Sequence, residues 1–245
     1  MRLFKILSAV LITVLFAACN FTEEIYFNKD GSGKMSILFD GGEMMQMLPA
    51  SDSTQLDKAI DSTLVFKDLL QDKKDSIAQL SAEEQAKFKR LEPFKLHMKV
   101  DPDNGVMNFN MYTDFKKVSE VNDAFNAFQN ASAVGPIAGG KSMPNSATEE
   151  TTQVNYTFKK NKFKRETIIL DQALFEKSID SLASAEMFLS SSTYTFKYHF
   201  PKRVKSTNIE EATFSMDGKT MIHEVNFLDM MKNPESIVIE VELEK

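Results

Sequence analysis

A single cysteine, Cys19, stands where a lipid could be attached to its sulfur. It follows a basic start with Arg2 and Lys5 and an apolar run over residues 6–18, which is the order of a secretory leader. A bilayer-spanning helix needs ~20 apolar residues, so we expect this shorter segment, residues 1–18, to be cleaved. Ordinary signal cleavage prefers small residues before the cut, but Phe16 lies three places before Cys19. A lipoprotein peptidase accepts a large apolar residue there, so the spacing predicts cleavage before Cys19 and its acylation.

The residues around Cys19 resemble a lipobox, although Phe16 stands where leucine is usual and Leu15 lies one place further back. A plain secreted protein or an uncleaved anchor are the alternatives. Asn20 differs from the aspartate that commonly retains a lipoprotein at the inner membrane, and residues 22–24 (Thr-Glu-Glu) resemble an acidic surface-export tag. We therefore expect a location in the cell envelope, on the outer membrane rather than the inner one, with the lipid on Cys19 as the contact to the membrane.

Catalytic and metal-binding residue types are few and scattered. His97 and His199 fall on the polar faces of expected strands, whereas His223 falls on an apolar face and is expected in the core. No His-x-x-x-His pair and no Gly-x-Ser-x-Gly elbow occurs, so a zinc site and a nucleophile relay lack their parts. We expect no catalytic residue, no metal and no cofactor. A hydrolase that pairs two carboxylates remains an alternative, because sequence alone does not pick such a pair out of thirty-five acidic residues.

Two further motifs are expected to have no functional role. Residues 135–142 match the phosphate-loop pattern, but a polar segment precedes them and Pro144 stands where a helix should begin, so we expect no nucleotide. Two groups of methionines could form a soft copper site, but no histidine or cysteine stands near them and methionine also fills cores. These are Met44, Met45 and Met47, and Met230 with Met231.

Four Asp-Ser runs resemble sites at which some envelope bacteria attach O-glycans. The candidate acceptors are Ser53, Ser62, Ser76 and Ser181. Because Asp-Ser is also a helix-cap signal, capping is the alternative interpretation.

A unit of strand, turn, strand and helix occurs four times, over residues 25–48, 96–128, 154–182 and 194–243. Asp-Gly pairs mark the first and last turns, and Ser119 and Asp171 are expected helix caps. Each strand alternates apolar and polar residues, which is typical of an antiparallel sheet with one buried face. The pattern predicts an α+β fold in which helices cover one face of an antiparallel sheet.

The remaining segments define the domain organisation. Residues 63–94 read as one or two longer helices, with Ser81 starting one of them, and are the best candidates for a crossing element or lid. Residues 131–151 are rich in Gly, Pro and small polar residues and predict a flexible loop. We expect residues 19–245 to form one domain containing this loop, with two separate halves as the alternative.

Two stretches resemble the LppM-type lipoprotein domain family. They are residues 26–33 (Tyr-Phe-Asn-Lys-Asp-Gly-Ser-Gly), and residues 200–204 (Phe-Pro-Lys-Arg-Val) followed by Thr207-Asn208, residues 216–220 (Met-Asp-Gly-Lys-Thr) and the last strand. Where that family has an aromatic residue after the Asp-Gly turn, this chain has His223 or Val225. The resemblance implies a mixed α/β domain directly behind a lipid anchor, mostly without assigned activity.

The formal net charge of −6 becomes −8 when Arg2 and Lys5 leave with the leader, which argues against nucleic acid as a partner. Together these features predict an envelope lipoprotein with a non-enzymatic binding or assembly role and a possible protein partner. The alternative is a carrier of lipid or another apolar ligand, in which the sheet is rich in Phe and Met and residues 63–92 form its lid.

Overall fold

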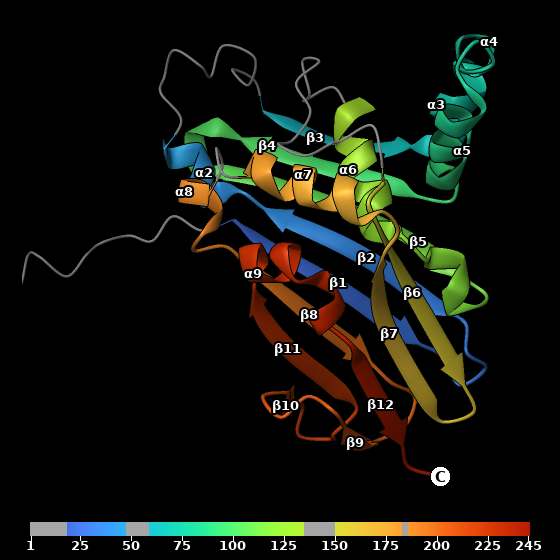
Figure 1. Ribbon diagram of the computed structural model, residues 1–245, viewed down its shortest axis with the longest axis vertical. Coiled ribbons are helices and arrows are strands. Elements are labelled where there is room, and N and C mark those ends of the chain that lie inside the picture. The colour runs from blue at the N-terminus through green and yellow to red at the C-terminus, as the bar shows by residue number, and fades with distance from the viewer. Residues whose placement is uncertain (1–18, 48–58, 135–149, 183–185) are drawn as a thin grey trace, which may run out of the picture.

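The computed structural model describes residues 19–47, 59–134, 150–182 and 186–245, and its strands form two sheets (Figure 1). The larger sheet has the order β10-β11-β8-β1-β2-β5-β4-β3. Its strands are β1 (Asn20–Phe27), β2 (Gly33–Asp40), β3 (Ile60–Val65), β4 (Lys95–Asp101), β5 (Val106–Phe115), β8 (Thr193–His199), β10 (Thr213–Phe214) and β11 (Thr220–Asn226). Neighbouring strands are antiparallel except β1 and β8, which run parallel.

The smaller sheet is antiparallel and lies across one face of the larger sheet (Figure 1). Its order is β6-β7-β12-β9, with β6 (Thr152–Lys159), β7 (Lys162–Ile169), β9 (Val204–Thr207) and β12 (Ile239–Leu243). Alternate side chains of these strands, such as Tyr156, Phe163 and Val241, are buried. Their burial against the larger sheet explains why the two sheets stay together.

Helices connect the strands and cover the rest of the buried face. They are α2 (Gly42–Met47), α3 (Phe66–Asp72), α4 (Lys74–Ile77), α5 (Ala82–Leu91), α6 (Ala124–Val134), α7 (Gln172–Leu182), α8 (Glu186–Leu189) and α9 (Phe227–Lys232), with the 3-10 helices η3 (Pro102–Asn104), η4 (Val118–Val121) and η6 (Pro234–Ser236). Phe125 of α6 and Phe227 of α9 pack around Phe21 of β1, with ring centroids 6.2 and 4.4 Å away. Within the described ranges, no helix combines the length and apolar character needed to cross a bilayer.

Several local predictions are confirmed. The first turn is closed by Asp30, whose Oδ1 accepts a hydrogen bond from the Ser32 amide at 3.0 Å, while Gly31 adopts φ +85°, a conformation that favours glycine. Ser81 and Glu84 form the expected capping box of α5. Asp171 caps α7 by accepting from the Leu174 amide at 2.9 Å.

The α+β class is confirmed, but the sheet arrangement differs from the one expected. There are two sheets in the described part of the chain, and the smaller sheet, together with the helices, covers the apolar face of the larger one. The strand order also interleaves the two halves of the sequence, because β1 lies between β2 and β8. Alternation within a strand specifies which side is buried, but it does not specify the element that buries it.

Two other expectations are corrected. Residues 63–65 belong to the edge strand β3, and α3, α4 and α5 pack on one another beside this edge instead of forming a lid over the sheet (Figure 1). Ser119 lies inside η4 and does not cap α6. That helix begins at Ala124, after Asp123, which has φ 60° and accepts from the Val154 amide at 2.8 Å. The hydrogen bond to β6 sets the start of α6.

Phe27 is one of the aromatic residues that pack between the two sheets. Its ring packs with Phe115 and Phe200 on one side of the interface and with Phe158 and Phe163 on the other, at centroid distances of 4.7 to 5.9 Å. Removing the ring would leave a cavity between the sheets, since packed cores collapse only partly around a deletion.

We therefore expect Phe27→Ala to lower the free energy of unfolding by about 3–5 kcal/mol in urea denaturation. Phe214→Ala, at a ring that is 45% exposed, is the matched control and should cost less than about 1 kcal/mol. Equal losses in the two variants would contradict the assigned sheet interface.

Candidate functional site

Cys19 lies directly before β1, with its side chain 5% exposed. Its amide donates to Ser192 Oγ at 3.2 Å, which ties it to the start of β8. Burial raises the pKa of the thiol to about 11, and the charges of Asp40 and Glu43 add to the shift. A thiol of this kind is almost fully protonated at neutral pH and is a poor nucleophile. If the sulfur carries a lipid, its attachment has to precede the packing of β1, or Cys19 has to leave this position. Acylation of Cys19 stays a prediction.

The acidic residues after Cys19 do not form an accessible tag. Thr22, Glu23 and Glu24 lie in β1, and the Glu23 side chain has 0% exposure. The strand begins at Asn20, five residues before the first residue counted in the sequence pattern. In the folded chain this segment is not displayed as an acidic tag, because Glu23 faces the core. The location on the outer membrane stays a prediction.

Glu23 forms a buried ion pair with Arg165 between the two sheets. Arg165, on β7, is 3% exposed, and its Nε lies 3.4 Å from Glu23 Oε1. The Glu23 carboxylate also accepts hydrogen bonds from the hydroxyls of Tyr194 at 2.9 Å and Tyr198 at 2.5 Å. The pair thus joins β1 and β8 of the larger sheet to β7 of the smaller sheet.

Arg165 has further partners on its own side of the interface. Its Nη1 donates to Thr167 Oγ1 at 3.2 Å and to the Ile237 carbonyl at 3.3 Å. Its guanidinium lies 4.7 Å from the centre of the Phe196 ring, within the range of a cation–π interaction. Each charge is therefore compensated by a charge, by hydrogen bonds or by an aromatic face, as a buried ion pair requires.

The protonation of this cluster is fixed by its surroundings. Burial raises the pKa of Tyr194 and Tyr198 well above the usual 10, and the negative charge of Glu23 adds to this effect. Both hydroxyls thus remain donors at physiological pH. Burial alone would lower the pKa of Arg165, but the charge of Glu23 raises it overall. Because solvent does not reach these groups, we assign the cluster a structural role.

The opposite, solvent-facing side of the larger sheet carries a second polar cluster. Glu24 Oε1 accepts from Tyr26 and Lys197 at 2.9 Å and lies 2.8 Å from His199 Nε2. Burial acts to raise the pKa of Glu24, but these three hydrogen bonds outweigh it and lower the pKa. His199 Nδ1 lies 2.9 Å from Thr220 Oγ1.

Thr220, His199 and Glu24 thus follow the hydroxyl–imidazole–carboxylate order of hydrolase relays. The Thr220 amide, however, donates to Ser215 Oγ at 3.0 Å, so this amide is not free to stabilise an oxyanion. The hydroxyl belongs to the first residue of β11. The geometry therefore gives this cluster the order of a relay, but the neighbouring amide is already used within the turn before β11.

The other two histidines lie on the faces that the sequence indicates. His97 is on the polar side of β4, with Nε2 2.9 Å from Asp61 Oδ1. His223 is buried on the inner side of β11, and burial lowers its pKa. In the described part of the chain, no group of three His, Cys, Asp or Glu side chains is placed to hold a metal.

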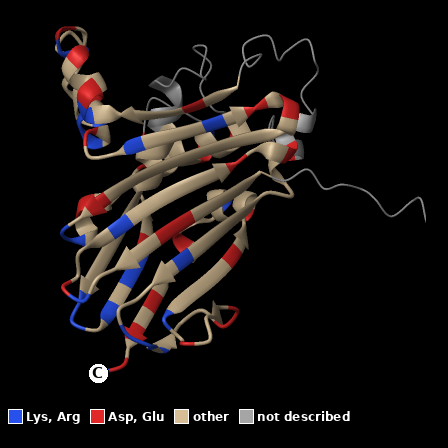
Figure 2. Ribbon diagram, turned by 180° about the vertical axis from the view of Figure 1, so that it is seen from behind, with Lys and Arg blue, Asp and Glu red and all other residues tan. Residues whose placement is uncertain are grey.

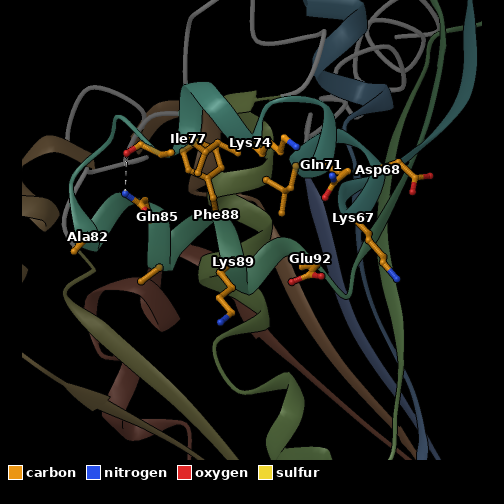
Figure 3. Close-up of a pocket in the computed structure, with 13 residues that line it drawn as sticks. Lys67, Asp68, Gln71, Lys74, Ile77, Ala82, Gln85, Phe88, Lys89 and Glu92 are labelled. Atoms are coloured by element: carbon orange, nitrogen blue, oxygen red, sulfur yellow. Dashed lines mark hydrogen bonds between the residues drawn. The ribbon is translucent and has the colours of Figure 1, made fainter.

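A cleft of about 620 Å³ lies between the helices α3, α4 and α5 (Figure 3). Leu70, Ile77 and Phe88 supply its apolar walls, and Phe88 and Ile77 lie together on one side of it. Three lysines also line the cleft: Lys67, Lys74 and Lys89. None of them has a carboxylate of a described residue within 4 Å. A cleft of this size and composition could hold one amphiphilic molecule.

The remaining sequence candidates do not converge on one site. Ser62 is exposed on β3, Ser76 on α4 and Ser181 on α7, whereas Ser53 and the phosphate-loop pattern at 135–142 lie outside the described residues. Met45 of α2 and Met230 and Met231 of α9 pack against the core, as expected of core filler. Ser181 Oγ donates to the Ser178 carbonyl at 2.6 Å inside α7.

Sequence reasoning missed Glu23 and Arg165. A signal was present, because Glu23 occupies the buried phase of β1 between Phe21 and Ile25. Arg165 holds the same phase of β7, between Phe163 and Thr167. A charge inside an apolar alternation on each of two distant strands indicates a buried pair, since an unpaired charge is rarely buried.

Comparisons with known proteins do not assign the chain to a family. No family model matches the chain, and no curated protein matches it in sequence. The NMR structure of the folded domain of LppM from Mycobacterium tuberculosis is similar over 96% of this chain and 94% of that one, with a TM-score of 0.39 and 8% sequence identity. At these values the likeness carries no conclusion about this chain.

The ion pair gives a specific prediction for stability. We expect Arg165→Met to lower the free energy of unfolding by about 3–5 kcal/mol, because it leaves the Glu23 carboxylate buried without its partner. The double variant Glu23→Gln/Arg165→Met should lose less than the sum of the two single variants, since both charges then leave together. Lys164→Met, at the exposed neighbouring position on β7, is the control. Additive losses in urea denaturation would show that the two groups do not interact.

Proposed function

We propose that the chain is an envelope lipoprotein with a non-enzymatic binding or assembly role, held to the membrane by a lipid on Cys19. The observation that supports this most directly is the position of Cys19 one residue before β1. β1 lies inside the larger sheet, between β2 and β8. An anchor at this residue has no linker between the lipid and the sheet, so it would hold the domain close to the bilayer.

The location on the outer membrane is part of this proposal and rests on Asn20 alone. Its side-chain Oδ1 accepts from Thr193 Oγ1 at 2.8 Å, so Asn20 is part of the folded domain. Lasting attachment needs two or more acyl chains, which lipoprotein processing supplies. The solvent-facing side of the larger sheet and the protruding helices α3 to α5 remain available to partners in this arrangement (Figure 1).

Replacement of Cys19 tests the anchor. In cells grown with labelled fatty acid, the unaltered chain should take up label and sediment with membranes, and Cys19→Ala should take up none. Ser192→Ala is the matched control, because it removes the hydroxyl that contacts the Cys19 amide and leaves the acceptor sulfur in place. A Cys19→Ala chain that still takes up label and stays membrane-bound would overturn the proposal.

A carrier of an apolar or amphiphilic ligand is the second candidate, and the cleft between α3, α4 and α5 supports it. In this version the ligand lies among the helices, since the apolar face of the larger sheet is filled by core side chains.

Native mass spectrometry after mild extraction from membranes tests the carrier. We expect a noncovalent adduct of one ligand, which Phe88→Glu should remove by placing a charge in the apolar wall. Glu83→Gln, on the same helix α5 but outside the cleft lining, should keep the adduct. Bare lipidated protein in every preparation would exclude the carrier role.

A further inference from the structure

Four turns meet at the end of the molecule that is opposite Cys19, and we call them the basic tip. They are residues 28–32, 159–162, 200–205 and 215–219. Phe27 packs against Phe158 and Phe200, with ring centroids 4.7 and 5.6 Å away, which brings the first three turns together. The Val204 amide donates to the Gly218 carbonyl at 2.8 Å and attaches the fourth.

The last strand holds these turns in fixed positions. The Leu243 amide donates to the Asn161 carbonyl at 2.8 Å, and the Glu244 amide donates to the Arg203 carbonyl at 2.9 Å. The Phe200 amide donates to the Lys219 carbonyl at 2.9 Å. The basic tip is therefore a preorganised surface, and a partner that binds it would not have to order these turns first.

Positive charge is concentrated at the basic tip, although the whole chain has a formal net charge of −6. Figure 2 shows Lys and Arg at the ends of the strands near the C terminus. Eight exposed cationic residues lie in or directly beside the turns: Lys29, Lys159, Lys160, Lys162, Lys202, Arg203, Lys205 and Lys219. The same four turns contain only two acidic residues, Asp30 and Asp217, so the tip presents a local charge opposite to that of the protein.

Most acidic groups at the tip are already engaged. Asp30 accepts from Ser32, and Asp217 accepts from Ser215 and from the Lys219 amide. Glu242 pairs with Lys205 at 2.6 Å, and Glu244 lies 4.0 Å from Arg203. Within the described ranges, six of the lysines have no carboxylate within 4 Å, namely Lys29, Lys159, Lys160, Lys162, Lys202 and Lys219. These lysines are available to an acidic partner.

Two apolar side chains stand among these lysines. Met216 is fully exposed, and the Phe214 ring is 45% exposed. Their turn packs tightly on Arg203, because a Cβ at Gly218 would lie 2.9 Å from Arg203 Cγ. Met, Phe and Arg are residue types enriched in protein interfaces. Exposed apolar side chains among cations thus suit a protein surface better than a polyanionic glycan, because a glycan would bury little of their apolar surface.

We infer that the basic tip docks an acidic protein surface, with Met216 and Phe214 as its apolar anchors and the surrounding lysines as the charged rim. The inference deepens the proposed binding role and rests on it. β1 runs from Cys19 to this tip over eight residues, about 26 Å of extended chain. A chain anchored at Cys19 can therefore present the tip away from its attachment point. Opposite charge would speed the encounter, and burial of the apolar anchors would prolong the complex.

Photo-crosslinking in intact cells tests the inference on the full lipidated chain. A benzophenone amino acid replaces Met216 at the tip or, as the control position, exposed Gln79 between α4 and α5. We expect a protein adduct from position 216 only, with the cross-linked partner peptide rich in Asp and Glu. The triple variant Lys29→Glu/Lys202→Glu/Lys219→Glu should lower the adduct yield about tenfold or more. The triple variant Lys73→Glu/Lys99→Glu/Lys177→Glu, at exposed lysines outside both the tip and the cleft lining, changes the net charge equally and should leave the yield unchanged.

Three results would overturn the inference: no adduct at position 216, an adduct whose yield is the same in the two triple variants, or an adduct made of lipid or glycan instead of protein. Circular dichroism of both triple variants establishes that they are folded before the yields are compared. Failure of the anchor is a separate outcome, because Cys19→Ala would then remain membrane-bound while the adduct at position 216 could still form.

Discussion

Glu23 and Arg165 carry opposite charges into the space between two sheets, and the rest of the packing has to accommodate them. Two fully buried charges are tolerated only with good mutual geometry and with partners for their remaining hydrogen-bonding groups. Tyr194 and Tyr198 supply these for the carboxylate, and Thr167 and the Ile237 carbonyl supply them for the guanidinium. A shift of β7 along the larger sheet would leave both charges unpaired. We therefore expect the pair to favour this alignment of the two sheets over shifted ones.

The proposed anchor directly precedes β1, the strand that carries Glu23, and this couples attachment to folding. Cys19 contacts β8 through Ser192, and its sulfur is enclosed by the fold. Strands β1 and β8 are far apart in sequence, and their pairing joins β8, β11 and β10 to the rest of the larger sheet. A lipid on Cys19 would therefore constrain the edge of the core itself, with no flexible tether between them. This explains why the orientation of the domain at a membrane would follow from the direction of β1.

Local sequence patterns predict the elements of this fold well and their assembly poorly. The Asp30–Ser32 turn, the Ser81 capping box and the Asp171 cap depend on residues within a few positions of one another, and all three form. The pairing of β1 with β8 and the packing of the second sheet depend on contacts between distant residues, which alternation does not encode. Glu23 shows the same limit at the level of one side chain. Read beside Glu24 it resembles part of an acidic tag, whereas read in phase with Phe21 and Ile25 it belongs to the core.

The distribution of charge also separates structural from functional groups. Inside the core, every charge that the fold depends on has partners, and solvent does not reach it. At the basic tip the acidic side chains shape turns or lie beside Lys205 and Arg203, and six lysines have no carboxylate within 4 Å among the described residues. Exposed Met216 adds an apolar group that contributes nothing to the core. The stability of the fold accounts for the paired charges in the core. It does not account for the unpaired lysines at the basic tip, because like charges repel one another and raise the free energy of the isolated domain. A binding partner of opposite charge would remove that cost.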